Sequence, residues 1–420
     1  MSEMLLLTSQ CNRVAVPVLD QPQLIYVLTE IMPGEVISKR RLPLNFALVL
    51  DRSGSMSGEK LRTMKDAVKN IIDQLEVDDI LSLITFESRT EVLFPAQRAG
   101  DKNALKKLVE KIRDGGGTNV APGLKAALRS VSQSMGEDRV SRIILLTDGE
   151  ATDPENDSRT IADEAGSRGV PIVSLGFGQD WNEDFLFDLA DRSILAPPGS
   201  RLGMADYIPT PKEAERIFQE VYQSMQVVAQ EVVITLRMVQ GLEARRVWQV
   251  TPIIRDVSFN AIQGQTIQLL VGQLEKTGAA YLAEIMLPPR PEGAVRFAQA
   301  DVTFSAPERG PSRQFADLII EYSNHPSVYN QMHGRVMNVV EKVQAFRLQT
   351  QALDDAQTGN VGSATRKLRQ AVTILLAQGE ADLASQMQQE ADQLESSGKI
   401  SSEGKKTIML TSRKTVRLSE

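Results

Sequence analysis

The stretch Asn45-Phe46-Ala47-Leu48-Val49-Leu50-Asp51-Arg52-Ser53-Gly54-Ser55 decides the fold. Its first six residues form a short, apolar run without alternation, which is typical of a parallel strand buried on both faces. The polar loop that follows begins where the strand ends, and α/β folds bind ligands at that edge of the sheet. The carboxylate of Asp51 and the hydroxyls of Ser53 and Ser55 are an all-oxygen donor set that suits a hard divalent cation. The loop has no Cys or His, so it is a poor site for zinc.

Two later segments supply further oxygen ligands. Gly115-Gly116-Gly117-Thr118-Asn119 is a glycine-rich loop that carries a hydroxyl just before a predicted helix. Ile143-Ile144-Leu145-Leu146-Thr147-Asp148 is a second apolar strand, and it ends in a carboxylate. We expect both to reach the same sheet edge as the first loop.

With these three elements the chain resembles the von Willebrand factor A domain over roughly residues 44 to 226. The resemblance implies that Ser53, Ser55 and Thr118 ligate a metal directly, and that Asp51 and Asp148 do so directly or through bound water. Together they would form the metal-ion-dependent adhesion site of that family. The expected cation is Mg2+ or Mn2+, with Ca2+ as a further candidate.

Hydroxyl ligands leave much of the cation's charge unquenched, so a Mg2+ held there keeps water in at least one position. A carboxylate from a partner protein can replace that water. A competing interpretation assigns Ser53 and Ser55 to capping the next helix and Asp148 to starting a turn.

Composition restricts the class of protein. The net charge of -7 and the pI near 5.3 argue against general nucleic-acid binding. The single cysteine, Cys11, excludes an internal disulfide framework. The first residues lack the basic region of a signal peptide, and no segment approaches the roughly 18 apolar residues of a membrane span. We therefore expect a cytoplasmic protein without membrane contact.

The pattern of elements predicts a doubly wound α/β domain, with a mostly parallel sheet, inserted in an antiparallel β-sandwich and followed by helices. An apolar strand over 24–31 needs a partner sheet, so we assign the N-terminal strands to the sandwich. The predicted domains are N-terminal sandwich strands (1–40), the metal-site domain (41–226), the rest of the sandwich (227–323), a helical hairpin or bundle (324–398) and a basic tail (399–420).

The C-terminal part leaves alternatives open. A Gly-Asn turn at Gly359-Asn360 faintly resembles one tetratricopeptide unit, but a helical hairpin packed on the body explains it as well. The tail carries lysines and arginines together with Thr407, Thr411 and Thr415. We interpret it as a docking or regulatory segment that phosphorylation would modify, whereas its two short apolar runs would also suit addition to a sheet edge.

Enzyme signatures are missing from the sequence. Met56 stands between Gly54 and Gly58 where a nucleophile elbow needs serine, and Glu59 follows Gly58 where a phosphate loop needs lysine. The only histidines, His325 and His333, lie outside the α/β region. We predict no enzyme activity, no catalytic residue and no organic cofactor.

Three hypotheses for function follow. The first is a protein-binding module or scaffold whose metal captures an Asp or Glu of a partner. The second is a substrate adaptor for a separate AAA+ ATPase. The third is a scaffold in a kinase-linked signalling system, regulated through the threonine-rich basic tail.

Overall fold

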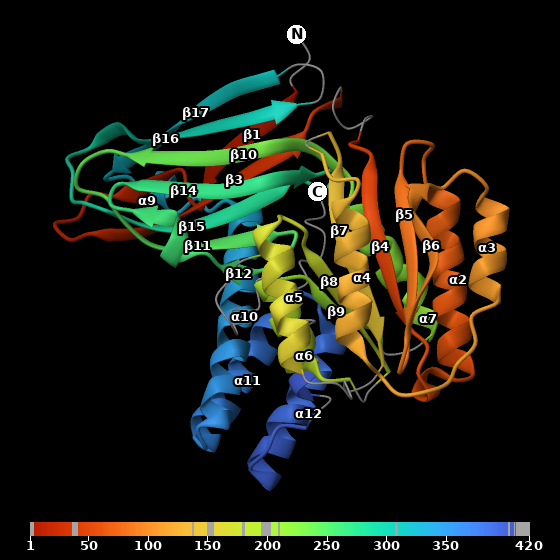
Figure 1. The fold of residues 1–420 in the computed structure, drawn as a ribbon. Helices are drawn as coiled ribbons and strands as arrows, with labels where there is room; N and C mark the ends of the chain where they lie inside the picture. Colours follow the sequence, from red (N-terminus) through yellow and green to blue (C-terminus); the bar gives the residue numbers. More distant parts are fainter. Residues whose placement is uncertain are drawn as a thin grey trace. The chain divides into compact units, whose positions relative to one another are not determined.

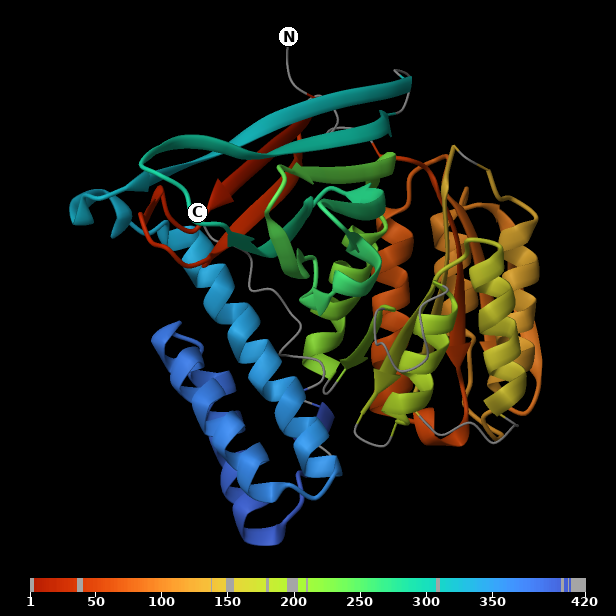
Figure 2. The same cartoon turned by 90° about the vertical axis from the view of Figure 1, so that its left-hand side faces the viewer.

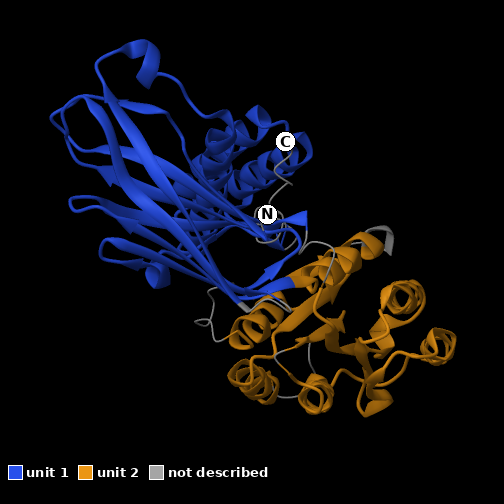
Figure 3. Ribbon diagram, turned by 90° about the horizontal axis from the view of Figure 1, so that it is seen from above, with its two compact units in different colours: residues 1–40, 228–420 blue, residues 41–227 orange. Residues whose placement is uncertain are grey.

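The computed structural model describes residues 4–35, 41–136, 138–148, 155–178, 181–194, 203–208, 211–306, 310–401, 404–406 and 408. The chain divides into two compact units, residues 1–40 with 228–420 and residues 41–227 (Figure 3). The second unit therefore interrupts the first in the sequence. In the described part of the chain, no helix is both long and apolar enough to cross a bilayer.

The inserted unit is built on one six-stranded sheet in the order β6-β5-β4-β7-β8-β9. Its strands are β4 (Leu44–Asp51), β5 (Ile80–Phe86), β6 (Thr90–Arg98), β7 (Val140–Thr147), β8 (Ile172–Phe177) and β9 (Ala205–Ile208). All neighbours pair in parallel except β6, which forms an antiparallel hairpin with β5 at one edge. The strand β9, which follows a polar stretch, was not predicted.

Helices cover both faces of this sheet (Figure 1). They are α2 (Glu59–Gln74), α3 (Lys102–Glu110), α4 (Val120–Ser132), α5 (Glu155–Ser167), α6 (Glu183–Arg192) and α7 (Pro211–Ser224), with the short 3-10 turn η1 (Gly54–Met56). The helix α2 contacts α3 and α7, and α5 contacts α4 and α6. The strands β4 and β8 are buried along their whole length because helices lie on both sides. The predicted α/β class is confirmed.

The other unit contains two stacked, mostly antiparallel sheets, one of which has a short edge strand that pairs in parallel. One has the order β1-β3-β15-β11-β12 and the other β13-β14-β10-β16-β17-β2. Their strands are β1 (Leu5–Cys11), β2 (Ala15–Pro17), β3 (Gln23–Pro33), β10 (Val227–Met238), β11 (Glu243–Thr251), β12 (Arg255–Asp256), β13 (Ile262–Gln263), β14 (Thr266–Glu275), β15 (Ala279–Leu287), β16 (Gly293–Ala306) and β17 (Gly310–Ser323). The short helix α8 (Ser258–Ala261) lies between β12 and β13. The pair β3–β15 runs from Gln23 opposite Leu287 to Ile31 opposite Ala279, so the N-terminal strands do join this sandwich.

Helices complete this unit. They are α9 (Pro326–Tyr329), α10 (Gly334–Gln357), α11 (Val361–Ala377) and α12 (Ala381–Ser397). The first half of α10 places Val336, Val339 and Val343 against Leu28, Trp248 and other side chains on the outer face of the β3-β15-β11 sheet. That sheet is thus covered on both faces, which explains why β15 is buried almost throughout. The last three helices are joined by short turns (Figure 2).

The described start of the predicted basic tail is partly buried. Glu390 of α12 accepts hydrogen bonds from the Ser401 amide (3.0 Å) and hydroxyl (2.7 Å), and Ile408 is buried. The prediction of a docking or regulatory segment here rests on the lysines and arginines of the stretch. Thr407, Thr411 and Thr415 lie outside the described residues, so their proposed regulation stays a prediction.

Candidate metal centre

Asp51 is the last residue of β4, and its side chain is fully buried. Its Oδ1 accepts the backbone N–H of Ser53 at 2.8 Å, and its Oδ2 accepts the hydroxyl of Thr147 at 2.6 Å. Thr147 ends β7, the strand next to β4. The carboxylate therefore fixes the turn that follows its own strand and ties it to the neighbouring strand end.

A chain of hydrogen bonds continues from this turn. The hydroxyl oxygens of Ser53 and Ser55 lie 3.0 Å apart, and the Ser55 hydroxyl donates to Asp148 Oδ1 at 2.7 Å. Ser53 and Asp148 are buried, whereas Ser55 is exposed. The structure thus brings the side-chain oxygens of three predicted ligands into direct contact at the carboxyl ends of β4 and β7.

The loop that carries Thr118 lies beside the same turn. The Gly115 amide donates to the Arg52 carbonyl at 2.9 Å, and the Gly54 amide donates to the Gly116 carbonyl at 3.2 Å. The Thr118 side chain is buried, with 6% exposed. The two loops are therefore hydrogen-bonded to each other, with Thr118 two residues beyond the contact.

The β5–β6 turn, which the sequence analysis does not single out, holds both loops in place. The Glu87 carboxylate forms an ion pair with Arg52 at 3.3 Å, and the Glu87 carbonyl accepts a hydrogen bond from the Asn119 amide at 2.8 Å. The Ser88 hydroxyl accepts the Gly117 amide at 2.8 Å. Gly116 has a φ of +75°, and a Cβ there would collide with the Glu87 carboxylate, so this position requires glycine.

The electrostatics of the centre favour a cation. Burial raises the pKa of Asp51, and the nearby Asp148 carboxylate adds to the increase, against hydrogen bonds from Thr147 and Ser53 that lower it. A positive charge beside a buried carboxylate stabilises its ionised form. Among the described residues no three His, Cys, Asp or Glu side chains cluster as metal ligands. The carboxylate and hydroxyl oxygens that meet at the strand ends suit a hard divalent cation.

Lys60, in the first turn of α2, is the main residue of the centre that sequence reasoning missed. Its Nζ lies 2.5 Å from Asp148 Oδ2, the carboxylate oxygen that Ser55 does not use. The side chain of Lys60 is 31% exposed and that of Asp148 is fully buried. The signal in the sequence is a lysine five residues after Ser55, but a lysine at a helix start usually belongs to the surface.

Of the acidic run that the sequence places after Asp148, Glu150 and Asp153 lie outside the described residues. Glu155 pairs with Arg159 at 2.7 Å along α5, and Asp157 is exposed. These two carboxylates therefore form ordinary surface of the first turn of α5.

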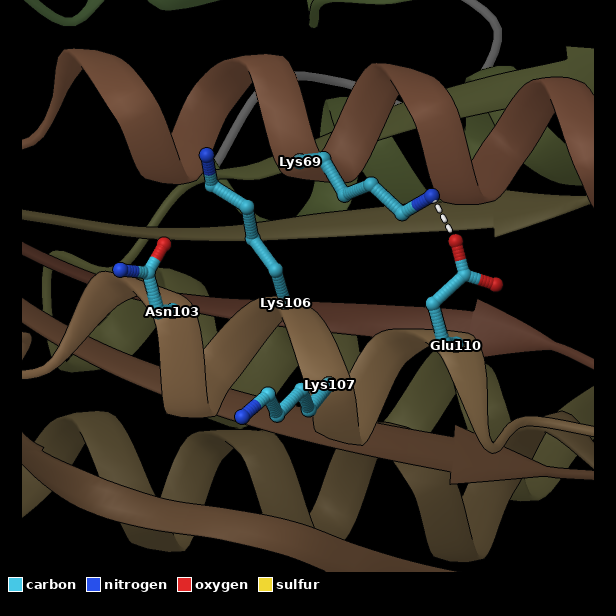
Figure 4. A pocket seen from close by; sticks show the side chains of 5 residues that line it. All are labelled: Lys69, Asn103, Lys106, Lys107 and Glu110. Carbon is cyan, nitrogen blue, oxygen red and sulfur yellow. Dashed lines mark hydrogen bonds and ion pairs between the residues drawn. The ribbon is translucent and has the colours of Figure 1, made fainter.

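A separate, lysine-rich hollow of about 470 Å³ lies between α2 and α3 (Figure 4). It is lined by Lys69, Asn103, Lys106, Lys107 and Glu110, and by none of the predicted metal ligands. Lys69 pairs with Glu110 across the hollow, as the dashed line shows, and Lys106 pairs with Asp73. These charges are largely neutralised within the surface itself.

The chain is similar to several known proteins. Residues 45–195 match the model of the von Willebrand factor type A domain, and residues 334–418 match that of the Sll0103-like C-terminal alpha-helical domain. The uncharacterized protein sll0103 of Synechocystis sp. is 40% identical over 187 residues, which are 44% of this chain and 42% of that protein. Human inter-alpha-trypsin inhibitor heavy chain H4 is 36% identical over 161 residues, 36% of this chain and 17% of that protein. The matches thus span less than half of either relative.

Two solved structures match almost the whole length of the chain at low sequence identity. A von Willebrand factor type A protein from Catenulispora acidiphila has a TM-score of 0.73 at 20% identity and covers 99% of this chain and 98% of its own. The ArnB paralog VWA2 from Sulfolobus acidocaldarius has a TM-score of 0.53 at 16% identity, with coverage of 99% and 100%. At this identity the likeness concerns the fold alone.

Proposed function

We propose that the centre holds Mg2+ or Mn2+ and binds an acidic side chain of a partner protein through this cation. The premise is that residues 45–195 form a von Willebrand factor type A domain. One observation carries this proposal. The hydroxyls of Ser53 and Ser55 and the carboxylate of Asp148 form one hydrogen-bonded chain at the strand ends where the sequence predicts the ligands.

Each residue has a distinct part in the proposed site. Ser53, Ser55 and Thr118 would supply neutral oxygens, and Asp51 and Asp148 would balance charge directly or through water. A cation held mainly by hydroxyls stays electrophilic and can exchange a water for a carboxylate oxygen. Because Ser55 is the exposed member of the set, a partner would approach from its side.

We propose binding and not catalysis. Hydroxyl nucleophiles need a general base within hydrogen-bond reach. The chain has only two histidines, and both belong to the sandwich-containing unit. The carboxylates nearest the serine hydroxyls, Asp51 and Asp148, would serve the cation in the proposed site. Neither the domain matches nor the described residues favour an AAA+ ATPase or a kinase as partner, so the proposal defines the partner by its carboxylate.

The test is titration of the metal-free protein with Mn2+, followed by calorimetry, for the wild type and Asp51→Asn. We expect Asp51→Asn to weaken Mn2+ binding by at least the roughly 10- to 100-fold that outer partners of metal sites contribute. Asp157→Asn is the matched control, because that carboxylate is exposed on α5 near the same edge. Equal Mn2+ affinity in the wild type and Asp51→Asn would refute the site.

The same variant has a second readout without metal. Asn can keep the Ser53 bond through its oxygen and bond Thr147 through its amide, while it removes a buried charge. Because burial raises the pKa of Asp51, ionisation of this group costs folding free energy when no cation is bound. We therefore expect the metal-free Asp51→Asn protein to melt at or above the wild-type temperature. A fall of several degrees would assign Asp51 to the fold and not to the ligand.

A further inference from the structure

Lys60 is held in a defined position at the centre. Its ammonium group contacts Asp148 Oδ2 on one side. On another side lies Gly178, just past the end of β8, where an added Cβ would come within 3.2 Å of Lys60 Cε and 3.3 Å of Nζ. Gly178 also has a φ of +77°, which favours glycine, and the lack of a Cβ leaves room for the Lys60 head. The ends of β7 and β8 thus enclose the lysine head.

Both carboxylate oxygens of Asp148 accept a hydrogen bond. Ser55 donates to Oδ1 and Lys60 donates to Oδ2. Lys60 therefore places a positive charge directly beside one of the predicted metal ligands.

The formal charge of the centre is the sum of three side chains. Asp51 and Asp148 contribute two negative charges and Lys60 one positive charge, which leaves one net negative charge. A divalent cation makes the loaded centre positive by one, and one carboxylate from a partner brings it to zero. Without Lys60 the cation alone would reach zero, and a partner carboxylate would leave an excess negative charge.

We propose that Lys60 sets the ligand preference of this centre: it weakens binding of the cation alone and strengthens capture of a carboxylate by the loaded centre. This inference rests on the proposed metal site. The two effects have opposite signs because the fixed positive charge repels the cation and attracts the anion. A lysine that only positioned Asp148 would give the same sign for both, since its loss would loosen the whole site.

The experiment compares the wild type with Lys60→Met and Lys60→Gln. Mn2+ is titrated first, and acetate is then added to the Mn2+-loaded protein while water proton relaxation reports displacement of Mn2+-bound water. Acetamide, which is uncharged and of similar shape, replaces acetate in a parallel series. Lys65→Met is the matched control, because it removes a lysine from the same helix whose Nζ donates to the Glu110 carbonyl at 3.2 Å and not to the centre.

In both Lys60 variants we expect Mn2+ to bind more tightly and acetate more weakly, each within the roughly 5- to 150-fold range of linked binding sites. Acetamide binding and Lys65→Met should show no change. Lys60→Gln keeps a hydrogen-bond donor for Asp148, so it separates charge from positioning and also covers a folding failure of Lys60→Met.

Unchanged or weaker Mn2+ binding in both variants would overturn the inference and leave the metal site intact. Mn2+ binding that is absent in the wild type would instead overturn the proposed function, and the inference with it.

Discussion

Asp79 offers the sharpest test of what holds the inserted unit together. It directly precedes β5, its side chain is fully buried, and it forms a two-pronged ion pair with Arg41, whose side chain is 3% exposed. The guanidinium Nη1 and Nη2 lie 2.8 Å and 2.6 Å from Oδ1 and Oδ2. The same carboxylate accepts the backbone amides of Leu44 and Glu76, both at 2.8 Å. One side chain therefore joins the start of β4, the start of β5 and the turn after α2.

The expected cost of Asp79→Ala follows from these contacts. Without Asp79 the buried Arg41 keeps, among the residues that the structure describes, only the exposed Glu76 as an ionic partner, at 3.2 Å, and breaking a buried ion pair costs about 3–5 kcal/mol. For a unit of this size, each kcal/mol lowers the melting temperature by roughly 2–4 °C, so we expect a fall of about 6–20 °C. Asp78→Ala is the matched control, because Asp78 is exposed and pairs with Arg98 only on the surface. Such a pair is worth about 1 kcal/mol or less.

The assay is thermal unfolding followed by circular dichroism, with Mn2+ titration below the transition. Asp79 lies at the opposite end of β5 from the metal centre, roughly 20 Å away at 3.3 Å per residue. Stability should therefore fall while Mn2+ affinity is retained. Melting of Asp79→Ala within a degree or two of Asp78→Ala would refute the reasoning.

Two further predictions concern the other unit. Hydrogen bonds from Arg313 and Arg237 hold the pKa of Asp301 below its ordinary value of 3.8, so the stability that Asp301 contributes is present above pH 3.8 and is lost as the pH falls through the lowered pKa. The difference in melting temperature between the wild type and Asp301→Asn should therefore shrink below pH 3.8. A constant difference from pH 3 to 6 would contradict this. Gln349 on α10 is buried, and neither polar atom of its side chain has a partner within the described part of the chain, so Gln349→Leu should stabilise the protein by about 1–3 kcal/mol, whereas Gln351→Leu at an exposed position of the same helix should not.

The sequence predicts the fold class well because its strongest signals are local. An uninterrupted apolar run such as 45–50 indicates a strand covered on both faces, and it forms β4. The apolar residues at helical spacing from Leu61 to Ile72 likewise form the buried face of α2. The strand at 24–31 shows apolar character that only a second sheet can bury, and it pairs with β15, far away in the sequence.

Contacts between distant segments are what the sequence could not supply. Arg41 ends the basic run Lys39-Arg40-Arg41, which is typical of an exposed loop, yet its guanidinium group is buried against Asp79. Gly176 in β8 has no local reason to be glycine, but a Cβ there would collide with the Trp181 ring. Lys60 resembles any surface lysine until the end of β7 is placed beside it. In each case the meaning of a residue depends on a partner whose position only the folded chain fixes.

In the candidate centre, too, the ligand residues could be predicted from local sequence whereas their supporting contacts could not. The motif residues could be predicted because each follows a strand end or a glycine-rich loop. The contacts that join these loops could not, because Arg52, Glu87 and Ser88 belong to no ligand motif. Yet these contacts help to hold the Thr118 loop against the first turn. Loops fixed by residues outside the ligand set stay in place when a ligand is exchanged. Substitutions at Asp51 and Lys60 should therefore alter what the centre binds while the domain remains folded.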